Sequence, residues 1–377
     1  MNKYLVSIVI PTKNRQYYCL AAVKQILSLN ESKIQICVQD NSDSDFLGKE
    51  LAALNTSNIV YHYHAGVLSF VDNFSEAISL ASGNFVCMIG DDDGVLPNII
   101  DAANYAQKHN LDGIIPGLNS VYFWPSPNPI RKGGEHGVLI INTIKDFKEK
   151  VNPQKAMVSL LKNGALDYAS YDLPRVYHGL VKKCIFDRIV TRTGKLFDGL
   201  TPDIYMAGAL SFMCTNVIRT QYPITVSGIC PTSGSADSAT GRHTGELKDA
   251  PHFRGHDHYN WEKSIPYIYS VETIWAETLL KVLHNFNKDA LLQYFNVQKM
   301  TNTCYRKYPQ FSERLESFAE SQGFVIAKCN ENKLLANVNK ITSKMLKFLR
   351  YGKTNSCFFY NIKDIQDAAQ KTSSFLL

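Results

Sequence analysis

The chain contains 377 residues, of which 45% are hydrophobic and 20% charged, and it carries a formal net charge of +6. This composition excludes an intrinsically disordered chain, which combines few apolar residues with a high net charge. No apolar run approaches the roughly 18 residues that a membrane-spanning helix needs. The charge is too small to indicate nucleic acid as a partner, so we expect none.

The first 115 residues alternate between short apolar runs of strand length and segments whose apolar side chains recur at helical spacing. This pattern predicts parallel strands joined by right-handed crossovers, and therefore an α/β fold. In such sheets ligands bind past the carboxyl ends of the strands. The predicted strands are 5–10, 34–38, 59–63 and 85–89, and the predicted helices are 16–29 and 70–81.

Beyond residue 116 the alternation weakens, and prolines and glycines indicate loop or edge structure. A helix is expected to begin near Thr201. Residues 227–258 are rich in Ser, Gly, Thr, Asp and His, which is typical of a long loop that acts as a lid or is disordered. Helical periodicity returns over 271–295, and the remainder is predicted to be mostly α-helical.

Nine cysteines are spread along the chain, and no two of them form a Cys-x-x-Cys pair. This odd number without pairs fits neither a disulfide framework nor a structural zinc site. We therefore expect a reducing, cytoplasmic compartment.

Three adjacent carboxylates, Asp91, Asp92 and Asp93, follow the predicted strand at 85–89. Like charges in contact disfavour one another unless a cation or a proton offsets them. Mg²⁺ and Mn²⁺ take oxygen ligands and often keep substrate phosphates in their coordination shell. The cluster therefore indicates a site for a metal and a diphosphate, and the alternative is a solvated acidic turn.

Four features in order along the chain carry a family resemblance: the run from Val6 to Arg15, Asp40 at the end of the second strand, Asn73, and the run from Phe85 to Pro97. In this order and spacing they resemble family 2 glycosyltransferases of the GT-A fold, of the type that builds bacterial cell-surface polysaccharide. The resemblance is clear over residues 4–100 and extends to about residue 215.

The resemblance implies a GT-A-like nucleotide-binding sandwich, in which a mostly parallel central sheet is flanked by helices, with a mostly α-helical C-terminal extension. It divides the chain into a nucleotide-sugar-binding α/β half at 1–115, an acceptor-binding half at 116–260 that contains the lid loop, and a helical region at 261–377. These boundaries are expectations.

By the same resemblance, the nucleotide pocket would be lined by Pro11, Thr12 and Arg15. Asp40 would accept a hydrogen bond from the N3–H edge of uracil or thymine, and Asn73 would support the pocket near the ribose and diphosphate. For Asp40 the alternative is a turn in which the side chain bonds to its own backbone.

Within the aspartate cluster the resemblance implies a division of roles. Asp91 and Asp92 would bind the nucleotide-sugar, with Asp92 facing the ribose or diphosphate, and Asp93 would hold a divalent cation, Mn²⁺ or Mg²⁺. The family often has an acidic residue where this chain has Gly90. The assignment of these roles among the three aspartates therefore stays open.

An inverting sugar transfer needs a general base for the acceptor hydroxyl. The candidate is Asp203, because the resemblance implies a base at the start of a helix about a hundred residues beyond the aspartate cluster. A structural alternative exists: Thr201 suits an N-cap, Pro202 suits the first helical position, and Asp203 would interact favourably with the helix dipole.

Further candidates flank this helix. We expect Arg175 or His178 to contact a sugar hydroxyl or phosphate, and the alternative is packing in the core. In the lid region, His256 and His258 are predicted to contribute one contact to the donor diphosphate or the metal, and the alternative is solvated histidines.

Residues 333–350 place apolar side chains on one side of a helical wheel and lysines opposite. A basic amphipathic helix can lie on an anionic membrane surface, and the alternative is packing against the protein. Together with the resemblance, this predicts a cytoplasmic enzyme, peripheral at the membrane, that moves a sugar from a nucleotide-sugar donor to a glycan or lipid-linked glycan acceptor.

Two other functions remain open. A non-catalytic protein that binds a nucleotide or sugar would keep the pocket without turnover. A nucleotidyltransferase would need a glycine-rich phosphate loop after the first strand, and Pro11-Thr12-Lys13-Asn14-Arg15 has the charge but not the glycines.

Overall fold

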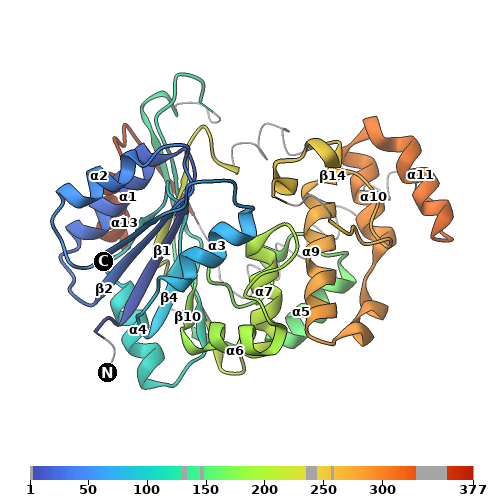
Figure 1. Ribbon diagram of the computed structural model, residues 1–377, viewed down its shortest axis with the longest axis horizontal. Helices are drawn as coiled ribbons and strands as arrows, with labels where there is room; N and C mark the ends of the chain where they lie inside the picture. The colour runs from blue at the N-terminus through green and yellow to red at the C-terminus, as the bar shows by residue number, and fades with distance from the viewer. Residues whose placement is uncertain are drawn as a thin grey trace.

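The computed structural model describes residues 3–129, 134–144, 148–234, 244–255, 259–327 and 355–376. Figure 1 shows a sheet-containing half, formed mainly by the N-terminal part of the chain, beside a half built mainly of helices. Within the described residues, each helix is too short or too polar to cross a bilayer.

Eight strands of the described residues form the main sheet, in the order β3-β2-β1-β4-β10-β6-β11-β9. β1 is parallel to β2 and β4, β2 to β3, and β6 to β11, whereas β10 and β9 run antiparallel to their neighbours. The predicted mostly parallel sheet is thus confirmed. The strands are β1 (Val6–Thr12), β2 (Ile34–Asp40), β3 (Ile59–Tyr63), β4 (Phe85–Met88), β6 (Gly113–Ile115), β9 (Lys148–Val151), β10 (Leu180–Lys182) and β11 (Val217–Thr220).

Helices cover both faces of this sheet. Successive strand residues point to opposite faces, and in β1 the residues on both faces are buried. On one face Ile8 and Ile10 of β1 belong to a core shared with α1 (Gln16–Ser28), α2 (Phe46–Ala53) and α4 (Ile99–Lys108). On the other face Val9 belongs to a core shared with α3 (Phe70–Ser79), α6 (Cys184–Thr193) and α7 (Pro202–Met213). The all-buried sequence of β1 follows from this two-sided packing.

A second sheet has the order β15-β8-β7-β12-β5. The last described segment, β15 (Ser356–Tyr360) and α13 (Ile365–Leu376), returns to the N-terminal half, where α13 packs against α1 and β12 (Figure 1). The strand at 356–360 was not among the expectations for the mostly α-helical end of the chain, because its pairing partner is β8, more than 200 residues earlier. The other strands are β5 (Gly94–Val95), β7 (Ser120–Phe123), β8 (Val138–Asn142) and β12 (Thr225–Ile229).

The helical half is built from α5 (Pro153–Lys162), α9 (Val271–Asn285), α10 (Val297–Lys307) and α11 (Ser312–Ser321), which share a core with one side of α7. Because most of α7 is buried, this helix joins the two halves. The predicted helix at 271–295 ends at Asn285, and a 3₁₀ helix follows at Asp289–Tyr294.

The predicted loop at 227–258 is only partly a loop. It contains the end of β12, the short strand β13 (Thr244–Gly245), which pairs with β14 (Tyr269–Ser270), and 3₁₀ turns at Leu247–Asp249 and Pro251–Phe253. Three predictions lie outside the described residues: the lid segment 235–243, the histidine pair His256 and His258, and the basic helix 333–350.

Candidate active site

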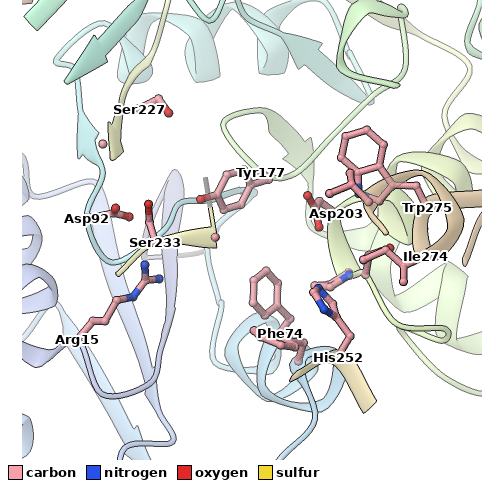
Figure 2. A pocket seen from close by; sticks show the side chains of 16 residues that line it. Arg15, Phe74, Asp92, Tyr177, Asp203, Ser227, Ser233, His252, Ile274 and Trp275 are labelled. Carbon is pink, nitrogen blue, oxygen red and sulfur yellow. The ribbon is translucent and has the colours of Figure 1, made fainter. Parts of the chain in front are cut away.

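A cavity of about 290 Å³ opens between the carboxyl ends of β1 and β4 and the first turns of α7 and α9. Its walls come from both halves of the molecule, as Figure 2 shows. The residues that line it include Arg15, Phe70, Phe74, Asp92, Tyr177, Thr201, Asp203, Ser227, Gly228, Ser233, His252, Ile274 and Trp275.

Asp91 is fully buried behind this wall and paired with Arg15. Its Oδ2 accepts hydrogen bonds from the Thr12 hydroxyl at 2.6 Å and from Nε of Arg15 at 3.0 Å, and its Oδ1 lies 2.8 Å from a terminal guanidinium nitrogen. Burial raises the pKa of Asp91 to about 7, although the Arg15 charge opposes the shift. Asp91 therefore fixes Thr12 and Arg15 at the end of β1, and Arg15 lines the cavity.

Asp93 is also buried, and three hydrogen-bond donors and the His178 ring surround it. The backbone N–H groups of Gly228 and Gly90 donate to its two oxygens at 2.6 Å each, and the Tyr177 hydroxyl donates at 3.2 Å. Nε2 of His178 lies 3.3 Å from Oδ2. Burial, and then the Asp92 charge, raises the pKa of Asp93. Asp93 is not among the residues that line the cavity, and the metal-binding role predicted for it stays a prediction.

Asp92 is the member of the cluster that lines the cavity. The backbone N–H of Cys230 donates to its Oδ2 at 2.9 Å, and Nε1 of Trp124 donates to its carbonyl at 2.9 Å. The β12 backbone passes very close to the aspartate turn at Gly228. A Cβ at this position would lie 1.8 Å from the backbone carbonyl oxygen of Asp92, so only glycine fits. β12 and the aspartate turn thus lock together, and they hold Asp92 on the cavity wall.

Asp203 lies across the cavity, in the first turn of α7 (Figure 2). The Tyr168 hydroxyl donates to its Oδ2 at 3.1 Å. Thr201 occupies the N-cap position and Pro202 begins the helix, as the sequence indicates, but the Thr201 side chain makes no capping hydrogen bond. Its hydroxyl is buried, lines the cavity and has no hydrogen-bond partner among the described residues.

Arg175 and His178 are both buried in this structure. Arg175 donates to the carbonyl groups of Ala169 at 3.4 Å and Pro116 at 3.3 Å, and burial lowers its pKa. Burial, and then the Arg175 charge, lowers the pKa of His178 to about 3, so its imidazole is neutral. Neither side chain is among those that line the cavity, and the predicted contacts with a sugar or phosphate stay predictions.

The remaining predicted donor-side residues gather at the ends of β1 and β2, where Thr12 pairs with Asp40 and Pro11 precedes it. Asp40 accepts from the backbone N–H of Ser42 at 2.8 Å, which is the local turn considered as its alternative, and from the Tyr61 hydroxyl of β3 at 3.1 Å. Asn73 donates to the carbonyl of Thr12 at 3.4 Å, and its buried Oδ1 has no partner among the described residues.

Comparison with known proteins assigns part of this architecture. The family model for glycosyl transferase family 2 matches residues 7–151. Residues 7–151, which are less than half of the chain, are thus similar to family 2 glycosyltransferases. The matched segment contains most of the first strand, Arg15 and the aspartate cluster, whereas Asp203 and Trp275 lie beyond it.

Two known proteins are similar to this chain. One, from Escherichia coli (strain K12), carries the name colanic acid biosynthesis glycosyl transferase WcaA and is 31% identical over 99 residues, which are 26% of this chain and 36% of that protein. The chain therefore matches about a third of the length of this relative. The other is TarS 1–349 of S. aureus in complex with UDP-GlcNAc, with a TM-score of 0.50 and 12% identity over 84% of this chain and 81% of that chain, which shows a shared fold.

Whether the matched segment can hold a divalent cation depends on its carboxylates. Among the described residues, no three His, Cys, Asp or Glu side chains form a ready-made metal site. Mg²⁺ is often bound through one or two protein carboxylates together with substrate phosphates. Asp92, on the wall next to Arg15, fits this kind of site.

Sequence reasoning missed the aromatic side of the cavity. Phe70 and Phe74 of α3, Trp275 of α9 and His252 reach it from separate elements, and the His252 ring lies 5.0 Å from the Phe70 ring. His252 lies in the segment 227–258, which the sequence identified only as a loop rich in Ser, Gly, Thr, Asp and His. The helical spacing of Phe70 and Phe74 indicated a core face, and nothing local marked Trp275, so only tertiary packing reveals this wall.

Proposed function

We propose that the protein is an inverting glycosyltransferase that moves a sugar from a nucleotide-diphosphate donor, with UDP- or dTDP-sugars favoured, to a hydroxyl of a glycan or lipid-linked glycan in cell-surface polysaccharide synthesis. The observation that carries this proposal is that Asp92 and Asp203 line one cavity from opposite halves (Figure 2). The similarity to family 2 glycosyltransferases supports it, as do a relative named for colanic acid biosynthesis and a structure in complex with UDP-GlcNAc.

The donor would bind on the side of Arg15 and Asp92. Arg15 is held by Asp91 at the end of β1, so its guanidinium is positioned to pair with phosphate oxygens. Asp92 would hold Mn²⁺ or Mg²⁺ together with the diphosphate, and the bound cation would stabilise negative charge on the leaving diphosphate. Recognition of a pyrimidine by Asp40 stays a prediction.

The acceptor would enter on the side of Asp203 and Trp275. Asp203 accepts the proton of the attacking hydroxyl, which strengthens the nucleophile as it approaches the anomeric carbon. Attack from the face opposite the leaving diphosphate inverts that carbon. The aromatic wall suits the apolar face of a sugar ring and excludes water from the reacting atoms.

Location is part of the same proposal. Cysteines within the described residues are all free, which agrees with a reducing, cytoplasmic compartment. Attachment of residues 333–350 to an anionic membrane stays a prediction.

The direct test combines binding with turnover. Thermal unfolding is followed with UDP, dTDP, GDP and CMP, each with and without Mn²⁺, and sugar transfer is then assayed with the nucleotide-sugars of the best ligand. Binding raises the melting temperature by mass action. A Mn²⁺-dependent shift with one diphosphate and turnover that Asp203→Asn abolishes would support the proposal. Binding without turnover favours the non-catalytic alternative, and no shift at all refutes the donor site.

A further inference from the structure

A buried tyrosine stands behind the proposed base. Tyr168 is 9% exposed and does not line the cavity, yet its hydroxyl donates to Oδ2 of Asp203 at 3.1 Å. Its ring meets the Trp275 ring edge to face, with centroids 4.9 Å apart and planes at 88°. Tyr168 therefore touches two cavity residues without reaching the cavity itself (Figure 2 labels both of them).

The backbone around Tyr168 is fixed by the end of α5. Gly164, Ala165 and Asp167 all have positive φ, at 74°, 60° and 55°, which makes a tight reversal after the helix. Asn163 donates to the carbonyl of Leu166 at 3.0 Å, and Ser170 donates to the Asp167 carboxylate at 2.6 Å. Left-handed backbone at Ala165 and Asp167 is costly, so it indicates that the surrounding structure requires this turn.

The direction of the Tyr168–Asp203 hydrogen bond is also determined. Burial, and then the Asp203 charge, raises the pKa of Tyr168 well above its usual value, so the phenol remains a donor. Other charged or titratable groups around this pair are the Tyr177 hydroxyl, Arg175, and His252 across the cavity. The side chains that α9 contributes next to Asp203, Ile274 and Trp275, do not titrate.

We propose that Tyr168 is a positioning residue for sugar transfer: its hydroxyl, held in place by the α5 turn and by Trp275, fixes the Asp203 carboxylate in the orientation that receives the acceptor proton. This inference rests on the proposed role of Asp203 as the base. A hydrogen bond to an ionised group is among the stronger ones in proteins, and it restricts rotation of the carboxylate. Tyr168 thereby affects the chemical step without touching either substrate.

The test is Tyr168→Phe, which keeps the ring against Trp275 and removes only the hydroxyl. We expect kcat to fall by about 10- to 100-fold, with the KM for the donor unchanged. The hydroxyl stabilises the ionised carboxylate, so its loss should move the acidic limb of the kcat/KM profile to higher pH. The matched control is Tyr171→Phe, on the same loop and half-buried, which should leave both quantities unchanged.

Two outcomes overturn the inference: a kcat within about twofold of wild type, or a lower kcat with an unmoved acidic limb. Should Tyr168→Phe unfold, 3-fluorotyrosine at position 168 replaces it. This more acidic phenol donates more strongly and should move the same limb to lower pH, and an unmoved limb counts against the inference. Asp203→Asn separates the two proposals: if that variant stays active, the base assignment fails, whereas an inactive Asp203→Asn with a normal Tyr168→Phe refutes only the positioning role.

Discussion

The two sides of the cavity are built differently. On the donor side, two carboxylates that are close together in the sequence are buried, and each has partners from other segments. Asp91 pairs with Arg15, and Asp93 accepts hydrogen bonds from backbone N–H groups and Tyr177. The acceptor side has one carboxylate, Asp203, held by a tyrosine among apolar and aromatic residues. The donor side thus resembles a fixed electrostatic scaffold, and the acceptor side a hydrophobic pocket with one reactive group. This comparison can be tested by substitution.

The largest effect is expected at Asp203. Asp203→Asn keeps the shape and the hydrogen bond from Tyr168 but removes the base, so kcat should fall by about 10²- to 10⁴-fold. Nucleotide-induced stabilisation should stay as in wild type, because Arg15 and Asp92 are untouched. Steady-state kinetics and thermal unfolding measure the two quantities, with the exposed Asp187→Asn as the control. An equal loss of nucleotide binding would show that the two sides are not separate.

Removal of the Arg15 charge should affect stability. Arg15→Met leaves the fully buried Asp91 carboxyl without its opposite charge. Breaking a fully buried ion pair costs about 3–5 kcal/mol, and because the Arg15 side chain is 23% exposed, we expect a loss near or below the lower end of this range. Urea unfolding should show this loss, together with weaker nucleotide binding. Arg188→Met, at an exposed position of α6, is the control and should change little. A stable Arg15→Met variant would mean that Asp91 is protonated in the native state and needs no partner.

Neighbouring aspartates should separate binding from stability. Asp92→Ala should abolish the Mn²⁺-dependent part of the nucleotide shift, because this residue lines the cavity. Asp93→Ala leaves two buried N–H groups without an acceptor and should lower the free energy of unfolding by about 3 kcal/mol. Each variant is the control for the other. If instead Asp93→Ala abolished the Mn²⁺-dependent shift and Asp92→Ala lowered only stability, Asp93 would be the metal ligand.

The smallest effect concerns a buried acid in the helical half. Glu277 of α9 accepts from the Tyr259 hydroxyl, and burial raises its pKa from 4.5 to about 7. The native state therefore keeps a proton that the unfolded chain releases, and stability should decline as pH rises from 4.5 to about 7. Glu277→Gln should remove the part of this decline in unfolding free energy that Glu277 causes. The part caused by Asp91, whose pKa is also raised to about 7, should remain. Unfolding free energies across this pH range, with exposed Glu313→Gln as the control, measure the difference.

The sequence predicted the donor side more fully than the acceptor side. Strand-length apolar runs and helical spacing correctly indicated the parallel sheet, and the short segment from Gly90 to Gly94 identified the aspartate turn. The resemblance implied that Asp92 faces the donor, but it did not indicate that Asp93 is enclosed, because that depends on Gly228, a residue more than a hundred positions away whose backbone N–H donates to Asp93. Arg175 and His178 are residue types that often contact ligands, but both are buried here. Arg175 donates a hydrogen bond to the backbone carbonyl of Ala169, and the imidazole of His178 is neutral.

By itself, the sequence determined the mostly parallel α/β sheet, the family resemblance and the position of Asp203 at the start of a helix, because these depend on local periodicity and on contiguous motifs. Only the tertiary structure decided that Asp91 and Asp93 are enclosed by donors from distant segments, that Tyr168, Trp275 and His252 come together near Asp203, and that β15 joins the second sheet. The physical reason is that burial and hydrogen-bond partners are set by contacts between distant segments, which no local pattern encodes.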